Sequence, residues 1–447
     1  MRKTISRFLV IALVLLTAVL VGSLAMYIYQ EGTSPDGSEP ALNIPFIPSK
    51  KETAEEYSRI ETLNLSKQTN DSDEISTHGY DSLTSDDLKK LYNALDDSVY
   101  RISEEISDDG RYKTKMIEIN GADMSSADIN LSINAYLYDH PQVFWIDNYF
   151  GYHSSNGVTY VECYSVLSGN QCELYIKRFN DALSEMLSDI SAEDGEYDRE
   201  KKLHNKLLKK CTYKKGVESL SDGWEYFSAY GALVGGEAVC EGYSKAMMLL
   251  LNLAGVDCTT IRGSGESKDS DWERHMWNLV NIGGKWYHLD STWDDNDEDE
   301  PSYDFFNLTT DSIRIDHIPD VLISESTHLD NFDYNFFMPE CKSTDMNYYY
   351  VEGVVINSLD EEAGNAITNK IYTLSQNNEC YVHILIGDNV EYDDFMNLMF
   401  NNGGNQFYDY IERVNSYLGE EHFSTKRCRL VENPKKKTLR VRLLDPE

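Results

Sequence analysis

A cysteine stands where a helix is expected to begin. In the stretch GEAVCEGYSKAMMLLLNLAG, Cys240 lies between Val239 and Glu241, and apolar residues then recur three and four positions apart up to Gly255. This spacing predicts an amphipathic helix whose first turn holds the thiol. Free N–H groups and the positive end of the helix dipole favour the reactive thiolate there and can hold an oxyanion. A buried structural cysteine fits the same position, so a nucleophilic role requires a partner base.

A candidate base follows in a predicted β-hairpin. The segment that starts at His275 alternates in polarity, Gly283-Gly284 is a two-residue turn signal, and a second strand leads to Asp290. Continuing the register of that turn places Trp277 opposite Asp290, which makes Asp290 the diagonal neighbour of His275 on one sheet face. A turn with an odd number of residues would put the imidazole and the carboxylate on opposite faces. The hairpin therefore predicts an imidazole oriented by a carboxylate, as a general base requires.

A second histidine competes for the role of base. His288 lies on the same predicted sheet face as His275, opposite Leu279 and deeper in the hairpin, so a structural role fits it better than catalysis. The sequence identifies no second oxyanion donor. Tyr230 and Trp277 carry suitable hydrogen-bond donors, although packing is the commoner role for such aromatic residues.

The segments around these residues resemble the transglutaminase-like superfamily. The resemblance rests on GEAVCEGYSKA around Cys240, HMWN from His275 and KWYHLDSTWD around Asp290, in that order within about residues 200–320. It implies an α+β, papain-like core, in which a helix that carries the cysteine packs on an antiparallel sheet that carries the histidine and the aspartate. It also implies that Cys240, His275 and Asp290 are the catalytic residues, and it implies neither a cofactor nor a metal.

A further motif narrows the resemblance to one branch of the superfamily. The sequence YDFFN, which ends at Asn307, is followed by His317, and both are similar to the bacterial and fungal cytokinesis-type transglutaminase/protease-like branch. The presence of the whole Cys-His-Asp set makes an inactive, scaffolding copy of the domain less attractive.

The residue types imply acyl transfer through a thioester. A Cys240 thiolate attacks a glutamine carboxamide or a peptide carbonyl, His275 moves the protons, and Asp290 fixes the imidazole tautomer. Attack of an amine on the thioester defines a transglutaminase, whereas attack of water defines a protease or a deamidase. The sequence does not choose between these acceptors. The contrasting class is a non-enzymatic cell-surface binding module.

The composition restricts the partners. The formal net charge of −36 over 447 residues excludes nucleic acid, which is bound through clustered Lys and Arg, and leaves a protein or peptide substrate. The eight cysteines are too sparse for a disulfide scaffold, and no CxxC or CxxH pair indicates a zinc site. Cys163 and Cys172 could bridge a predicted hairpin, but buried thiols fit equally well.

An acidic run follows the candidate aspartate. Residues 294–300 lack the spacing and the glycine of an EF-hand loop, so they predict a solvated loop rather than a calcium site. Such a loop, together with the acids of residues 265–274, would favour cationic acyl acceptors near the site.

The chain divides into five expected segments. These are a signal peptide or membrane anchor (1–30), a disordered linker (31–82), an N-terminal α+β region (83–212), the catalytic core (213–345) and a C-terminal α+β domain (346–447). Basic residues precede the apolar run of residues 8–29, which is long enough to span a bilayer. We therefore expect an extracellular or cell-surface protein that is anchored by residues 8–29, its only membrane contact, or secreted after cleavage. The oligomeric state is not predicted.

Local patterns predict the elements of the flanking regions. In the N-terminal region they are helices from about 84 and from 126, strands 143–146, 158–166 and 172–179, and helices 179–191 and 196–212. In the C-terminal domain they are strand 348–357, helix 360–375, strand 380–386, two short helices and a hairpin 426–443 that turns at Asn433-Pro-Lys-Lys-Lys.

Overall fold

The computed structural model describes residues 44–45, 76–191, 193–266, 272–296, 301–326, 334–401 and 403–446. The predicted signal or anchor segment, most of the predicted linker and residues 297–300 of the acidic run lie outside this part of the chain. Within the described ranges, no helix has both the length and the apolar character needed to cross a bilayer.

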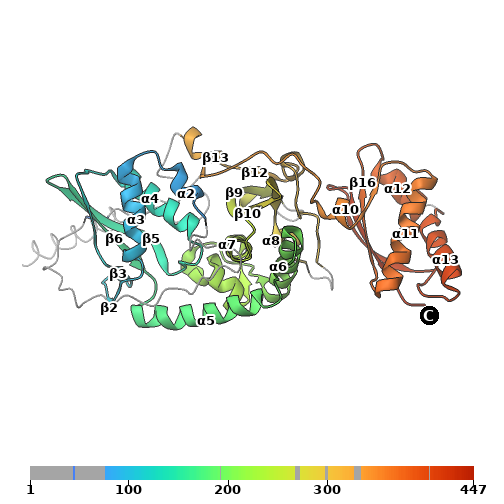
Figure 1. The fold of residues 1–447 in the computed structure, drawn as a ribbon, viewed down its shortest axis with the longest axis horizontal. Helices are drawn as coiled ribbons and strands as arrows, with labels where there is room; N and C mark the ends of the chain where they lie inside the picture. Colours follow the sequence, from blue (N-terminus) through green and yellow to red (C-terminus); the bar gives the residue numbers. More distant parts are fainter. Residues whose placement is uncertain are drawn as a thin grey trace, which may run out of the picture.

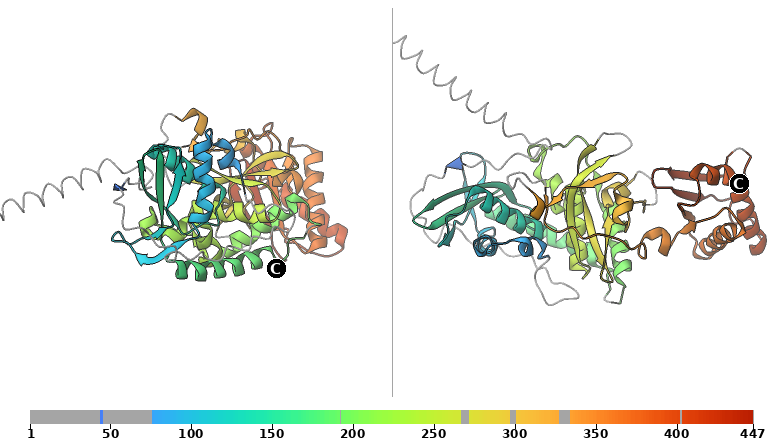
Figure 2. Two further views of the ribbon diagram at one scale, coloured as in Figure 1. Left: turned by 60° about the vertical axis from the view of Figure 1, so that its left-hand side comes forward. Right: turned by 90° about the horizontal axis from the view of Figure 1, so that it is seen from above.

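Three parts follow one another along the long axis of the molecule (Figures 1 and 2). One apolar cluster runs through the first two parts, from Leu83 to Tyr348. A separate cluster, from Val354 to Leu443, fills the third part, which is the C-terminal domain. The fold class is α+β, as the sequence predicts.

The N-terminal region packs three helices beside a six-stranded sheet in the order β1-β5-β6-β3-β2, with β4 also paired to β6. The strands are β1 (Ile44–Pro45), β2 (Ile102–Ile106), β3 (Tyr112–Thr114), β4 (Ile117–Asn120), β5 (Ile146–Ser155) and β6 (Val158–Ser165). The helices are α2 (His78–Ser82), α3 (Asp86–Ser98) and α4 (Ser126–Asp139). Serines cap the two longer helices: Ser85 accepts from the backbone of Leu88, and Ser125 forms a capping box with Asp128.

Two predicted strands of this region are wrong. The apolar run before Ile146 forms turns rather than a strand, with its side chains buried. The segment that contains Cys172 belongs to a long helix, α5 (Gly169–Leu187), because Ser168 starts it with a capping box and apolar residues recur at helical spacing. The observed hairpin is β5–β6 instead. Cys163 and Cys172 are both free, buried thiols.

The core is built on a four-stranded antiparallel sheet in the order β11-β10-β9-β12. The strands are β9 (Cys258–Glu266), β10 (Trp272–Ile282), β11 (Lys285–Leu289) and β12 (His317–Pro319). Helix α7 (Cys240–Leu253) packs against β9 and β10, and α6 (Glu196–Lys210) packs against α7. Ahead of α7, β7 (Thr212–Tyr213) pairs in parallel with β8 (Glu237–Ala238).

Short elements complete the core. They are the 3-10 turns η1 (Leu220–Asp222), η2 (Trp224–Phe227) and η4 (Ile323–Glu325), the π-helical turn η3 (Gly231–Gly235), the helices α8 (Ser291–Asp294) and α9 (Thr310–Ile313), and the strands β13 (Val321–Leu322) and β14 (Tyr334–Asn335). A small apolar cluster that includes Trp277, Phe305 and Ile313 joins the sheet to the segment that follows α8.

The C-terminal domain follows the predicted order with one exception. Its elements are α10 (Tyr348–Val351), β15 (Val354–Ile356), α11 (Glu361–Asn377), β16 (Tyr381–Ile386), α12 (Tyr392–Met399), α13 (Gln406–Leu418), β17 (Cys428–Asn433) and β18 (Thr438–Leu443). The sheet order is β15-β16-β18-β17. The predicted strand 348–357 begins instead as the helix α10, which Asn347 caps through the backbone N–H of Tyr349.

Candidate active site

Cys240 is the first residue of α7, as the helical pattern predicts, and its side chain is partly exposed. The N-cap residue, Val239, has no side-chain acceptor, so no side chain caps the N–H groups of the first turn. Ser244, one turn further, donates to the carbonyls of both Cys240 and Met276 at 2.8 Å. This double contact fixes the start of α7 against β10, the strand that carries His275.

His275 and Asp290 meet at 2.6 Å between Nε2 and Oδ2, and both side chains are almost fully buried. The predicted hairpin register is confirmed as far as the Asn278–Leu289 pair. The predicted pairing of Trp277 with Asp290 does not form, because the ladder ends there. The backbone N–H of Asp290 donates instead to Phe305, and its Oδ1 caps α8. The carboxylate still reaches the imidazole from this position.

The charges of these groups support one another. Burial alone would lower the pKa of His275, but the carboxylate of Asp290 and the hydrogen-bonded thiol of Cys240 raise it to about 10. Burial would raise the pKa of Asp290, but His275 and His317 hold it well below its ordinary value. Since Asp290 holds the Nε2 side of the ring, Nδ1 is left for the thiol. The raised pKa favours the imidazolium form of His275 beside Cys240.

A second histidine shares the same carboxylate oxygen. His317 Nε2 lies 3.0 Å from Asp290 Oδ2, and His317 Nδ1 lies 2.8 Å from Asp316 Oδ1. His317 is fully buried. The possible ligand atoms of His275, Asp290 and His317 lie within 4.8 Å of one another, a spacing that could suit a metal ion. The hydrogen bonds to Asp290 account for that spacing.

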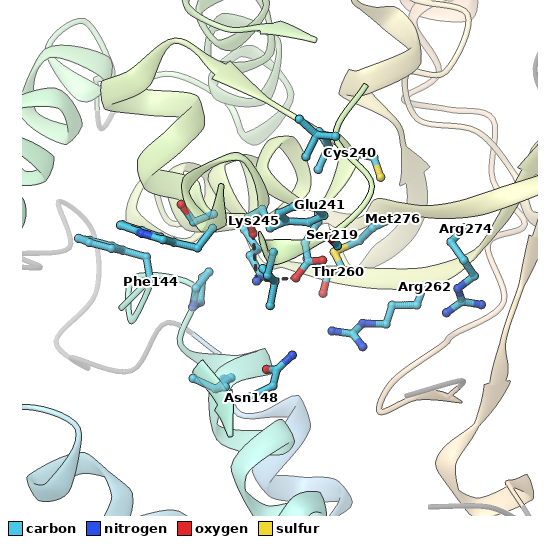
Figure 3. Close-up of a pocket in the computed structure, with 18 of the residues that line it drawn as sticks. Phe144, Asn148, Ser219, Cys240, Glu241, Lys245, Thr260, Arg262, Arg274 and Met276 are labelled. Atoms are coloured by element: carbon cyan, nitrogen blue, oxygen red, sulfur yellow. Dashed lines mark hydrogen bonds and ion pairs between the residues drawn. The ribbon is translucent and has the colours of Figure 1, made fainter. Parts of the chain in front are cut away.

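A cavity of about 1460 Å³ opens beside the thiol. Figure 3 shows Cys240, Glu241 and Lys245 on one side of it, with Phe144 and Asn148 approaching from the N-terminal region. The N-terminal region therefore forms one wall of this cavity. Ion pairs line it with both signs of charge, namely Arg111–Asp147, Glu241–Lys245 and Arg274–Asp320. Positive and negative side chains balance along the described part of the cavity wall, so the charge of the wall gives no support to a preference for cationic acceptors. That preference stays a prediction.

Residues 184–291, which include Cys240, His275 and Asp290, match the family model of the transglutaminase-like superfamily. The chain carries a transglutaminase-like core. Kyphoscoliosis peptidase from Homo sapiens is 30% identical to it over 118 residues, which cover 22% of this chain and 18% of that protein. The Mus musculus protein of the same name is 31% identical over 97 residues, which cover 18% and 14%. The chain thus spans less than a fifth of the length of these relatives.

The chain also overlaps in part with a solved structure, described as the crystal structure of a TGase. That overlap covers 42% of this chain and 53% of the other chain, at 14% identity and a TM-score of 0.23. The assignment of a transglutaminase-like core therefore rests on the family match and on the packing of α7 against an antiparallel sheet. The finer resemblance to the cytokinesis-type branch stays a prediction.

The other histidine and the aromatic residues considered from the sequence have packing roles in this core. Trp277 Nε1 donates to His288 Nδ1 at 3.0 Å, so the indole N–H does not face an oxyanion. Burial lowers the pKa of His288 to about 3, which keeps it neutral and structural, as the register predicts. Tyr230 packs among Phe144 and Tyr175.

The start of the acidic run is not the solvated loop that its composition predicts. Asp294 is fully buried, and its Oδ1 accepts from the backbone of Phe305 at 3.0 Å. Asp295 accepts from the hydroxyl of Tyr243 on α7 at 2.6 Å. These two acids tie the segment after Asp290 to its surroundings, because a buried carboxylate needs partners of this kind.

Two acids of the core, Glu200 and Asp294, are fully buried. Asn307 donates to Glu200 Oε2 at 2.7 Å, and Asp294 Oδ2 lies 3.2 Å from His204 Nε2. Burial raises the pKa of Glu200 to about 8 and, against the pull of His204, that of Asp294 to about 7. Both acids are therefore protonated in the folded protein at pH values at which the unfolded chain is ionised.

We expect the free energy of unfolding to fall as the pH rises from about 5 to about 8, and Glu200→Gln to make this fall shallower. In that window the folded state binds the extra proton, so each pH unit lowers stability by about 1.4 kcal/mol for this group. Denaturant unfolding at several pH values measures the slope, with the exposed Glu173→Gln as the control. A Glu200→Gln protein with the wild-type slope would contradict the assignment.

Proposed function

We propose that this protein is a cysteine acyltransferase that attacks glutamine carboxamides of a protein or peptide substrate through Cys240. The proposal rests above all on the 2.6 Å contact between His275 Nε2 and Asp290 Oδ2, with Cys240 near enough to raise the pKa of the same imidazole. The match of this segment to the transglutaminase-like superfamily supports the same chemistry.

In the first step the Cys240 sulfur attacks the carbonyl carbon, and the oxygen becomes an oxyanion. The C–N bond then breaks, His275 gives its proton to the leaving nitrogen, and a thioester remains on Cys240. Asp290 stays ionised throughout and holds the imidazole in place, because its pKa lies well below its ordinary value.

In the second step an amine attacks the thioester, His275 takes its proton, and the thiolate leaves. If water replaces the amine, the same steps give hydrolysis. Hydrolysis is the second candidate, and the relatives named kyphoscoliosis peptidase favour it. The two outcomes share every residue named so far and differ only in the acceptor.

Tyr213 is a candidate for the second oxyanion donor. It lines the same cavity as Cys240 and belongs to β7, which pairs with the strand directly before α7. Burial and then the charge of Cys240 raise the pKa of Tyr213, so its hydroxyl stays protonated and can donate. The backbone N–H groups at the start of α7 supply the other donors.

Replacing Tyr213 with phenylalanine is expected to lower kcat by about 100-fold and to change KM little, because the lost hydrogen bond forms only with the oxyanion. Steady-state kinetics on a glutamine substrate measure both constants. Tyr149→Phe is the matched control, since Tyr149 lines the cavity from the N-terminal region. A Tyr213→Phe enzyme as fast as this control would exclude the role.

Incorporation of a fluorescent amine into a glutamine-containing protein tests the proposed function. We expect Cys240-dependent labelling, with no labelling by Cys240→Ala. New peptide termini without amine incorporation would assign the activity to a peptidase, and release of ammonia without either would assign a deamidase. Absence of all three products would leave a binding module as the explanation.

We also propose that the protein acts outside the cytoplasm, either anchored by residues 8–29 or secreted. The support is the basic and then apolar sequence of the N-terminus. Labelling of intact cells with a membrane-impermeant, amine-reactive reagent tests this, and a protein that becomes accessible only after lysis would contradict it.

A further inference from the structure

A lysine of the C-terminal domain is buried against the core. Lys436 lies in the turn between β17 and β18, and its side chain is only 5% exposed. Its Nζ donates to Asp316 Oδ1 and to the carbonyl of Ser312, both at 2.8 Å, and it lies 4.8 Å from the centre of the Phe305 ring. Each of these partners belongs to the segment that covers the sheet of the core.

Neighbouring residues fix this turn in place. Asn433 and Thr438, at its two ends, both donate to the carboxylate of Asp304, at 2.8 and 2.7 Å. The C-terminal domain (Figure 1, orange to red) is therefore joined to the core at the face that carries Asp290 and His317.

The contact of Lys436 continues into the active site. Asp316 Oδ1, which accepts from Lys436, also lies 2.8 Å from His317 Nδ1. His317 Nε2 lies 3.0 Å from Asp290 Oδ2, the oxygen that holds His275. Both nitrogens of the His317 ring therefore face a carboxylate oxygen.

The result is a row of side chains that are alternately basic and acidic. From the C-terminal domain to the nucleophile, they are Lys436, Asp316, His317, Asp290, His275 and Cys240. A buried carboxylate without a cation either takes up a proton or draws one from its neighbour. Without Lys436, Asp316 would compete with Asp290 for the protons of His317 and disturb the carboxylate that orients His275.

We propose that Lys436 is a positioning residue of the active site and that it acts on Asp290 through Asp316 and His317. The C-terminal domain thereby contributes a residue that the catalytic centre requires. This inference rests on the proposed function, because it concerns the reactivity of Cys240. It gives the C-terminal domain a role that the family match, which ends at residue 291, does not cover.

The test uses the full chain and the rate at which iodoacetamide alkylates Cys240 at neutral pH, measured by mass spectrometry. We expect Lys436→Met to lower this rate about tenfold, as is common for residues that orient a functional group through another. Lys435→Met is the matched control, since Lys435 is the neighbouring residue and forms an exposed ion pair with Glu266. Unfolding curves establish that each variant is folded at the assay temperature.

A rescue experiment separates positioning from simple anchoring of the turn. Asp316→Asn keeps an acceptor for His317 but needs no cation, so the double variant Lys436→Met/Asp316→Asn is expected to recover most of the lost rate. A Lys436→Met protein as reactive as Lys435→Met would overturn the inference, and so would a slow double variant. Slow alkylation of Cys240 in the wild-type protein would contradict the proposed function itself, whereas the two outcomes above would contradict only the role of Lys436.

Discussion

Replacement of Cys240 by alanine is expected to lower the acyl-transfer rate by about 10⁴-fold or more, because no other group can form the thioester. The substitution removes only a sulfur at a partly exposed position, so the fold is expected to remain intact. The rate of amine incorporation or of peptide cleavage measures the effect.

The control for this substitution is Cys380→Ala. Cys380 is also a partly exposed free thiol, but it lies in the C-terminal domain, away from His275. It is expected to keep the wild-type rate. Residual activity of Cys240→Ala within tenfold of the wild type would assign the chemistry to another residue.

Loss of the carboxylate at position 290 is expected to have the second largest effect. Asp290→Ala removes the partner of His275 and of His317 and also the cap of α8, so we expect the rate to fall by about 10³- to 10⁴-fold. Part of this loss reflects the Nε2 atoms of two buried imidazoles, which lose the Asp290 carboxylate. Unfolding curves and kcat together separate destabilisation from lost catalysis.

Asp290→Asn separates charge from geometry at the same position. The amide keeps an oxygen acceptor, but the negative charge that raises the pKa of His275 to about 10 is lost. The pKa of His275 then falls towards its ordinary value, and the imidazolium that supports the thiolate is lost at a lower pH. In a plot of kcat/KM against pH, the alkaline limb is expected to move down by more than one unit. An unmoved limb would show that Asp290 does not set the charge of His275.

The local patterns around the site were sufficient to predict most of its geometry. Apolar spacing after Cys240 predicts α7, and the glycine pair, both of whose residues have positive φ, predicts the β10–β11 register. The alternation of polar and apolar residues does not predict that the chain leaves the β-ladder at Asp290. This departure follows from capping of α8 and from a backbone bond to Phe305, which lies in a later segment.

Long-range contacts of the site have no comparable local signal. His317 reaches Asp290 from a three-residue strand, and the sequence marks it only through the resemblance to a family branch. Lys436 and Asp316 are 120 positions apart, and the run of three lysines suggests a solvated turn. Tyr213 lies in a strand of two residues. Such residues are brought together by tertiary packing, which sequence periodicity does not encode.

The misassigned segment around Cys172 has a similar explanation. A short apolar run fits a buried strand and a buried helix about equally well, and the capping box between Ser168 and Gln171 distinguishes them. The correction matters for function because α5 leads directly into the segment that matches the transglutaminase-like superfamily.

Site-resolved alkylation of the native protein at about pH 6 tests most directly whether Cys240 is an activated nucleophile. All eight cysteines are free thiols, and Cys380 and Cys428 are partly exposed like Cys240, so they serve as internal references. We expect iodoacetamide to modify Cys240 at least tenfold faster than these two, and the difference to disappear in denaturant. Equal, slow labelling of the three thiols in the native protein would contradict the account.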